Sequence, residues 1–158
     1  MRRRRILFLV PAAMLVLVLA LGGIAAAAGH GSADKAASKQ ALVTTRKTKL
    51  GTILVNAQGR SLYLFLKDKN GKSACSGACA KAWPPLMSTG KPKAAGGANA
   101  KLLGTTKRSN GTQVTYNGHP LYTFFQDTKA GQTKGQGSNF FGALWYVMGT
   151  NGKQITKS

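Results

Sequence analysis

Short runs in which hydrophobic and polar positions alternate are the main pattern of this chain, and they predict strands rather than helices. The runs are rich in β-branched and aromatic residues, and turn signals such as Gln58-Gly59, Asn117-Gly118 and Asn151-Gly152 separate them. We therefore expect three β-hairpins, with strands at 50–57 and 61–66, at 112–116 and 121–125, and at 143–148 and 153–156. The predicted fold class is mainly β, a small single domain of β-hairpins.

Only one helix is expected, and it is short. Residues 75–83 read CSGACAKAW and predict a helix near Ser76 to Lys81, because Pro84 and Pro85 end it. Residues 87–100 are rich in Gly, Pro, Lys and Ala and predict a loop.

One stretch of the pattern occurs twice. Residues 59–68 (GRSLYLFLKD) align without a gap with residues 118–127 (GHPLYTFFQD), and a Gly, a Leu, a Tyr, a Phe and an Asp are identical. An extended solenoid needs about three repeats or more, so two copies predict two related hairpins packed into one domain. The expected bounds are about 50–87 for repeat 1 and about 102–148 for repeat 2.

Each copy of the aligned stretch, 59–68 and 118–127, ends in the motif Tyr-x-Phe-x-x-Asp, which is formed by Tyr63, Phe65, Asp68, Tyr122, Phe124 and Asp127. Strand alternation places the Tyr and the Phe of one motif on the same face, so we expect both pairs in the core together with Trp145 and Val147. Each Asp falls at a strand end, where its carboxylate can accept backbone N–H bonds and fix the turn. The motif is therefore interpreted as structural, as a turn cap or an ion-pair partner. A metal or ligand role is the alternative, although two isolated carboxylates make a poor cation cage.

The N-terminal segment has a different pattern. Arg2 to Arg5 are followed by a run without charge over residues 6–28 that ends in small residues, which is typical of a signal peptide cleaved after Ala28. An uncleaved anchor is the alternative, because the run approaches the roughly 20 apolar residues that span a bilayer. Residues 29–41 then predict a flexible tether, and residues 42–158 the secreted domain.

Charge changes the expectation about partners. The chain has 23 Lys and Arg against 3 Asp and no Glu, a formal charge of +20, and loss of Arg2 to Arg5 with the signal would leave +16. Such a charge attracts anionic polymers and membrane surfaces. For an exported protein we expect anionic envelope polymers or lipid headgroups as partners, and no nucleic acid. Plain solubility is the alternative explanation.

Two cysteines, Cys75 and Cys79, are the other candidate chemistry. Nearby thiols outside the cytoplasm usually oxidise, and their spacing is not the Cys-x-x-Cys of thioredoxin-like enzymes, so a local disulfide is expected. A redox-active pair and a metal site are the alternatives. Only His30 and His119 could assist, and no catalytic or metal-ligand set is formed. We therefore predict no catalytic residue, no metal and no cofactor, and a non-enzymatic envelope protein that works as a binding or interaction module.

Several motifs together carry a family resemblance. They are both Tyr-x-Phe-x-x-Asp copies, CSGAC at 75–79 leading to WPP at 83–85, TYNGHPLY at 115–122, GQG at 135–137 and Trp145-Tyr146. In these the chain resembles the bacterial secreted or lipoprotein repeat family of unknown function, marked by Tyr-x-(Phe/Trp/Tyr)-x-x-Asp, over about 50–155. The lipid-anchoring cysteine of many members is missing near Ala28, so a lipoprotein anchor is not expected here.

The resemblance implies a connection to hydrocarbon (alkane) catabolism in some bacteria, and no residue of this chain explains that connection. It leaves two alternatives to the binding module. One is a redox accessory protein that uses Cys75 and Cys79, and the other is a protein that binds an apolar small molecule among its aromatic residues.

Overall fold

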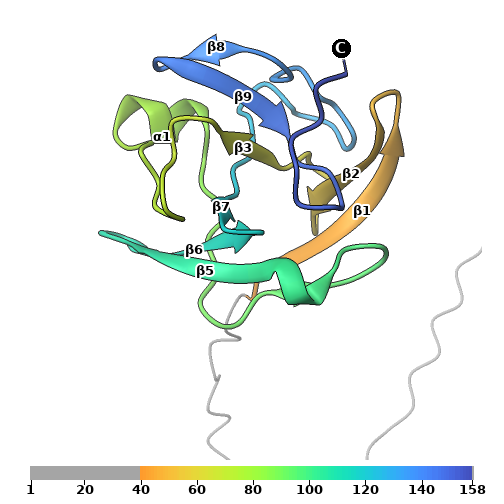
Figure 1. The fold of residues 1–158 in the computed structure, drawn as a ribbon, viewed down its shortest axis with the longest axis horizontal. Coiled ribbons are helices and arrows are strands. Elements are labelled where there is room, and N and C mark those ends of the chain that lie inside the picture. Colours follow the sequence, from red (N-terminus) through yellow and green to blue (C-terminus); the bar gives the residue numbers. More distant parts are fainter. Residues whose placement is uncertain (1–39, 158) are drawn as a thin grey trace, which may run out of the picture. The chain divides into compact units, whose positions relative to one another are not determined.

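Three small sheets and one short helix make up residues 40–157, which are the residues that the computed structural model describes (Figure 1). The predicted signal peptide and nearly all of the predicted tether lie outside this range. The expected mainly β fold with one short helix is confirmed. Within residues 40–157, no helix is long and apolar enough to cross a membrane.

Each sheet has three strands. The first has the order β2-β1-β4, formed by Gly51–Asn56, Leu42–Thr48 and Lys93–Ala94. The second has the order β3-β9-β8, formed by Tyr63–Phe65, Ala143–Val147 and Asn139–Phe140. The third has the order β5-β6-β7, formed by Leu103–Arg108, Gly111–Tyr116 and His119–Pro120. The remaining elements are the helix α1 at Ala78–Ala82 and a 3-10 turn at Ala100–Leu102.

The pairing of the first predicted hairpin is wrong. The partner of β2 along its whole length is β1, whereas β3 pairs with β9 and only the bridge between Val55 and Ser61 joins the two predicted strands. The reason lies in the turn between them. The Asn56 side-chain oxygen accepts the backbone N–H groups of Gln58 and Arg60 at 3.0 Å each, which closes a wide turn after which the chain leaves the sheet of β2.

The second predicted hairpin is confirmed at its turn, and the third only in part. Strands β6 and β7 pair around Asn117-Gly118, but the chain then leaves β6 to bridge Tyr63 from Tyr122. The predicted strand at 153–156 makes only the bridge between Met148 and Gln154, since β9 already has β3 and β8 as its neighbours. Strands β1 and β5 were not predicted.

Backbone pairing interlaces the two repeats. Leu54 of β2 donates its N–H to the carbonyl of Met148 at 3.0 Å, and Val114 of β6 donates in the same way to Leu86 at 2.8 Å. Strand β2 therefore bonds the end of repeat 2, and β6 bonds the end of repeat 1. Tyr63 and Tyr122 bond each other through both backbone N–H groups, at 2.8 and 3.0 Å, as residues related by a local two-fold axis do.

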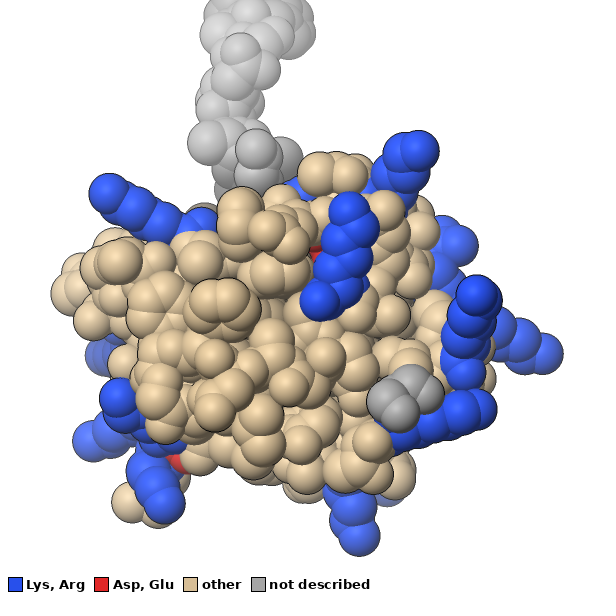
Figure 2. All heavy atoms as spheres, turned by 90° about the horizontal axis from the view of Figure 1, so that it is seen from above, with Lys and Arg blue, Asp and Glu red and all other residues tan. Residues whose placement is uncertain are grey.

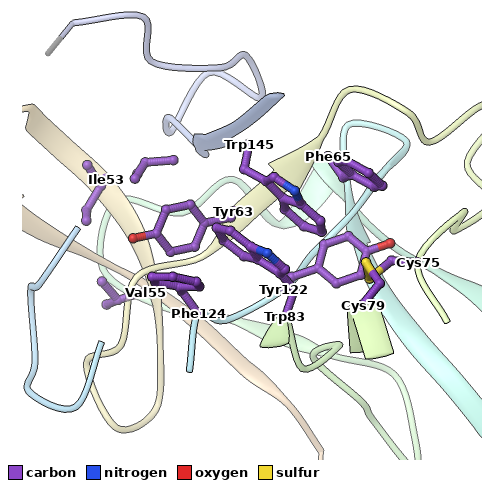
Figure 3. Close-up of a cluster of buried hydrophobic side chains, with 11 residues drawn as sticks. Ile53, Val55, Tyr63, Phe65, Cys75, Cys79, Trp83, Tyr122, Phe124 and Trp145 are labelled. Atoms are coloured by element: carbon purple, nitrogen blue, oxygen red, sulfur yellow. A yellow bond between two sulfur atoms is a disulfide. The ribbon is translucent and has the colours of Figure 1, made fainter. Parts of the chain in front are cut away.

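The core lies on both sides of β3, whose three residues are all buried. One cluster includes Leu54, Leu62, Leu64, Val114 and Tyr116. The other includes all six predicted core residues, Tyr63, Phe65, Tyr122, Phe124, Trp145 and Val147, so that prediction is confirmed (Figure 3).

Candidate functional site

Four stacked aromatic rings form the centre of the domain, and we call them the central stack (Figure 3). Its order is Phe65, Trp145, Trp83 and Phe124, with ring centroids 4.0, 4.0 and 4.2 Å apart. Each repeat supplies one Phe and one Trp, and each Phe stacks on the Trp of the other repeat. The edges of the stack are closed by Tyr63 against Trp83 and Tyr122 against Trp145.

The loop at 135–137 covers this stack. A Cβ atom at Gly135 would lie 2.5 Å from the Trp83 ring, so only glycine lets the backbone come so close. Gln136 accepts the N–H of Val147 with its side-chain oxygen at 2.9 Å, which ties the loop to β9. The Gly-Gln-Gly motif is thus explained by packing.

The tyrosines and aspartates of the two motifs are bonded crosswise. The Tyr63 hydroxyl donates to Oδ2 of Asp127 at 2.5 Å, and the Tyr122 hydroxyl donates to Oδ2 of Asp68 at 2.8 Å. The Oδ1 atoms accept a backbone N–H a few residues downstream, at 2.9 Å from Lys134 and at 2.7 Å from Ala74. The two carboxylates therefore make equivalent bonds, as expected for a repeat, and each closes the loop that follows its strand.

Burial sets the protonation of these groups. It raises the pKa of the Asp68 and Asp127 carboxyls above the usual range, although the hydrogen bonds that they accept act in the opposite direction. Burial also raises the pKa of the Tyr63 and Tyr122 hydroxyls, which therefore stay protonated and act as donors.

The two aspartate sites differ in exposure. Asp127 is fully buried, whereas Asp68 is half-buried and lies in a wider polar network. Within this network the Tyr122 hydroxyl also contacts Ser73 Oγ at 2.7 Å, and Arg108 donates to that same Oγ.

Arg108 is held rigidly at this place. Its guanidinium donates to the Gln113 side chain at 2.9 Å and to the Cys75 carbonyl at 2.6 Å, and it also donates to Ser73. Its Nε is buried without a partner among the described residues. The side chain is thereby fixed, and its positive charge stays next to Ser73 and the Cys75 carbonyl.

A recess of about 350 Å³ opens next to Arg108. We call it the basic recess, and its lining includes Lys72, Ser73, Ser76, Lys107, Arg108 and Ser109. Lys72 and Lys107 are exposed, and so are Ser76 and Ser109, so these two charges and these two hydroxyls are available to an incoming group. Such a set can bind an anion by charge and by hydrogen bonding.

One of the two cysteines, Cys75, also lines the recess. Cys75 and Cys79 are joined in the predicted local disulfide, and their Cα atoms lie 5.3 Å apart, which is within the range that a disulfide allows. Both residues are buried and belong to the aromatic core cluster, and Cys79 lies within α1. The disulfide therefore fastens α1 to the loop that carries Ser73 and Ser76.

Sequence reasoning identified Asp68, Tyr122 and the cysteines but missed Ser73, Arg108 and Gln113. The missed signal was the position of Arg108 within the repeat. Arg108 pairs with Gly111 in the third sheet as Thr48 pairs with Gly51 in the first, so Arg108 replaces a threonine. Among the described residues, no group of three His, Cys, Asp or Glu side chains could hold a metal ion.

Comparison with known proteins gives one family. A family described as a secreted repeat of unknown function matches the chain twice, over residues 44–87 and 104–148, which together are more than half of it. The first match includes most of β1, which the predicted repeat at about 50–87 had left out. Searches of curated proteins and of solved structures each gave no significant match.

Proposed function

Because the chain belongs to the family of secreted repeats of unknown function, we propose that it is a non-enzymatic binding module of the cell envelope. Its ligands are the anionic phosphate or carboxylate groups of envelope polymers and lipid headgroups. The basic recess is the place at which such a group is held.

The observation that carries the proposal is the uneven exposure of charge. Asp68 and Asp127 are the only carboxylic side chains within residues 40–157, and each accepts a hydrogen bond from a buried tyrosine, with Asp127 fully buried and Asp68 half-buried. Lys and Arg side chains, in contrast, project from the surface, as Figure 2 shows for one face. The surface positive charge is thus hardly neutralised within the domain, and it attracts anions at a distance.

The basic recess concentrates this general attraction. Lys72 and Lys107 line the recess together with the fixed guanidinium of Arg108, and the exposed hydroxyls of Ser76 and Ser109 offer additional donors. A phosphate diester or a carboxylate takes up such donors, and no proton transfer or covalent step is required.

The other two hypotheses gain no support from the arrangement of their residues. Cys75 and Cys79 are buried, which keeps an external thiol away from the disulfide. Trp83 and Trp145 are fully buried and stacked on each other, so neither ring is available to an apolar ligand in the described part of the chain.

A salt titration tests the proposal. The secreted domain is applied to an immobilised polymer of glycerol phosphate, and to vesicles of phosphatidylglycerol, at rising salt concentration. We expect attachment at low salt that weakens steeply, because mobile ions screen exposed charges over about 8 Å at physiological ionic strength. Absence of attachment to both surfaces at low salt would contradict the proposal.

Two variants with the same net charge locate the binding place. Lys72→Gln with Lys107→Gln removes both lysines of the basic recess, and Lys101→Gln with Lys153→Gln removes two exposed lysines that do not line it. We expect the recess variant to release the polymer at a clearly lower salt concentration than the control. Equal release by both would show that the recess has no special role.

A further inference from the structure

The turn between β8 and β9 exposes two aromatic rings. Phe140 is 54% and Phe141 is 40% exposed, and we call the two residues the phenylalanine tip. Their neighbour Trp145 holds the turn in place, because its ring N–H donates to the Phe140 carbonyl at 3.1 Å. The exposed rings are therefore presented by a turn that is anchored to the core.

The backbone of this turn is unsuited to phenylalanine. Phe141 has a φ of 60° and is followed by Gly142 with a φ of 87°, the left-handed pair of a tight hairpin turn. This conformation is an outlier for a bulky side chain. The only other non-glycine residues with positive φ in the described chain are Asn70 and Asn117, and a glycine follows each. The chain thus uses Asn-Gly at two turns and Phe-Gly at the turn that exposes the ring.

The surroundings of the phenylalanine tip are apolar and basic. Lys67 donates from its Nζ to the Phe141 carbonyl at 3.2 Å, and Leu66, which bonds the start of β9, is also exposed. Figure 2 looks onto the side of the molecule on which Figure 1 draws β8 and β9, and it shows a broad uncharged area with Lys and Arg side chains at several places around it. An apolar projection with positive charge nearby is complementary to the surface of an anionic membrane.

We propose that the phenylalanine tip inserts at the boundary between the headgroups and the acyl chains of a bilayer that contains anionic phospholipid, so that the bilayer is the partner of this protein. This inference rests on the proposed function, which supplies the attraction of the basic surface. The tip adds a hydrophobic contribution to the binding free energy, which charge alone does not provide. Phenylalanine rings gain free energy by leaving water for acyl chains, and a hydrated wall polymer offers no such apolar phase.

The strain at Phe141 permits a decisive variant. Phe140→Thr with Phe141→Asn converts the turn to Asn-Gly, which this chain already uses at Asn117-Gly118, and places a β-branched residue in β8. The variant is expected to fold at least as well as the wild type. We expect its partition coefficient onto vesicles of phosphatidylcholine with phosphatidylglycerol to fall about tenfold for each ring removed.

Phe125→Thr is the matched control. Phe125 is 53% exposed. Tyr122 and Tyr63 pair antiparallel, so the chain after Tyr122 runs in the opposite direction to the chain after Tyr63, which leads to Leu66 and the start of β9. Phe125 therefore lies away from the phenylalanine tip. We expect this control to bind vesicles like the wild type. In a separate variant, Phe141→Trp, brominated acyl chains should quench the introduced indole and not the buried Trp83 and Trp145.

The outcomes separate the two proposals. If the wild type and the tip variant bind the glycerol phosphate polymer equally and only the tip variant loses the vesicles, the inference holds. If both bind the vesicles equally, or if the indole introduced by Phe141→Trp is not quenched, the inference is wrong while the proposed function stands. If the tip variant instead changes a dimer to a monomer and keeps its vesicle affinity, the rings bind a second copy and the inference is wrong. Failure to bind either surface overturns the proposed function itself.

Discussion

At the scale of single residues, the crossed bonds between tyrosines and aspartates link the two motifs. Tyr63 reaches Asp127, and Tyr122 reaches Asp68, so each motif is completed by the other repeat. Both acceptors are ordinary carboxylates that would prefer water. Their position inside the domain is tolerated because a hydroxyl and a backbone N–H replace the lost hydration.

Removal of one hydroxyl should therefore be costly where the carboxylate is fully buried. We expect Tyr63→Phe to lower the free energy of unfolding by about 1.5–3 kcal/mol, as for the loss of a hydrogen bond to a charged group. Asp127→Asn should have a similar effect, since its amide N–H₂ would face a hydroxyl that needs an acceptor. The double variant should lose less than the sum, because the same bond is removed once. Urea denaturation measures all three.

The second pair provides the control. Asp68 is half-buried, so water can replace the Tyr122 hydroxyl, and Tyr122→Phe should cost clearly less than Tyr63→Phe. Equal losses at both tyrosines, or strictly additive losses at Tyr63 and Asp127, would show that the crossed bond is not the cause.

At the scale of elements, the local pattern predicts where strands lie and does not predict which strands pair. The sequences of β2, β6 and β9 are rich in β-branched and aromatic residues, and the strands predicted at these places are confirmed. The pairing of β3 with β9 joins Tyr63 to Val147, and no turn between neighbouring strands specifies a contact so distant in the sequence. Strand β1 was missed because its half-exposed LVTTRKT pattern resembles a polar segment.

The residues of the candidate site likewise divide into those that the local sequence indicates and those that only strand pairing brings together. The cysteines and the motif residues are visible because spacing and repetition mark them. Arg108 resembles the other cations of a very basic chain, and only the pairing of β5 with β6 shows that it lies against Gln113 and next to Ser73.

The disulfide is the element whose role can be measured most directly. Cys75→Ala together with Cys79→Ala opens a very short loop, so we expect the free energy of unfolding to fall by about 2 kcal/mol. Binding of glycerol phosphate polymer should stay within twofold of the wild type, because the lysines of the basic recess remain. A loss of all binding with unchanged stability would instead show that the disulfide is needed to hold the basic recess in its binding shape.

At the scale of the whole molecule, the backbone bonding of each repeat is completed by the other repeat. Strand β3 of repeat 1 needs β9 of repeat 2, and Leu86 of repeat 1 completes the sheet of β6. The central stack likewise alternates between the repeats. The domain is therefore expected to fold as one cooperative unit.

Separation of the repeats tests this expectation. A chain of residues 40–97 and a chain of residues 98–157 should each be unfolded alone, since each lacks the partner strand and half of the central stack. Mixing the two should restore the near-ultraviolet circular dichroism of the stacked tryptophans. A stable fold of either chain alone, with dispersed amide signals in NMR, would contradict the interlaced arrangement as the source of stability.

The interlacing also means that the domain is equivalent to a dimer whose two subunits have been fused into one chain. Fusion fixes the effective concentration of each half for the other, so assembly no longer depends on how much protein is present. A mutation in a true homodimer changes both subunits together, whereas here Asp127 is fully buried and its counterpart Asp68 is half-buried and bonded within a wider polar network. One half is thus left to maintain the architecture, and the other half is free to acquire a binding surface.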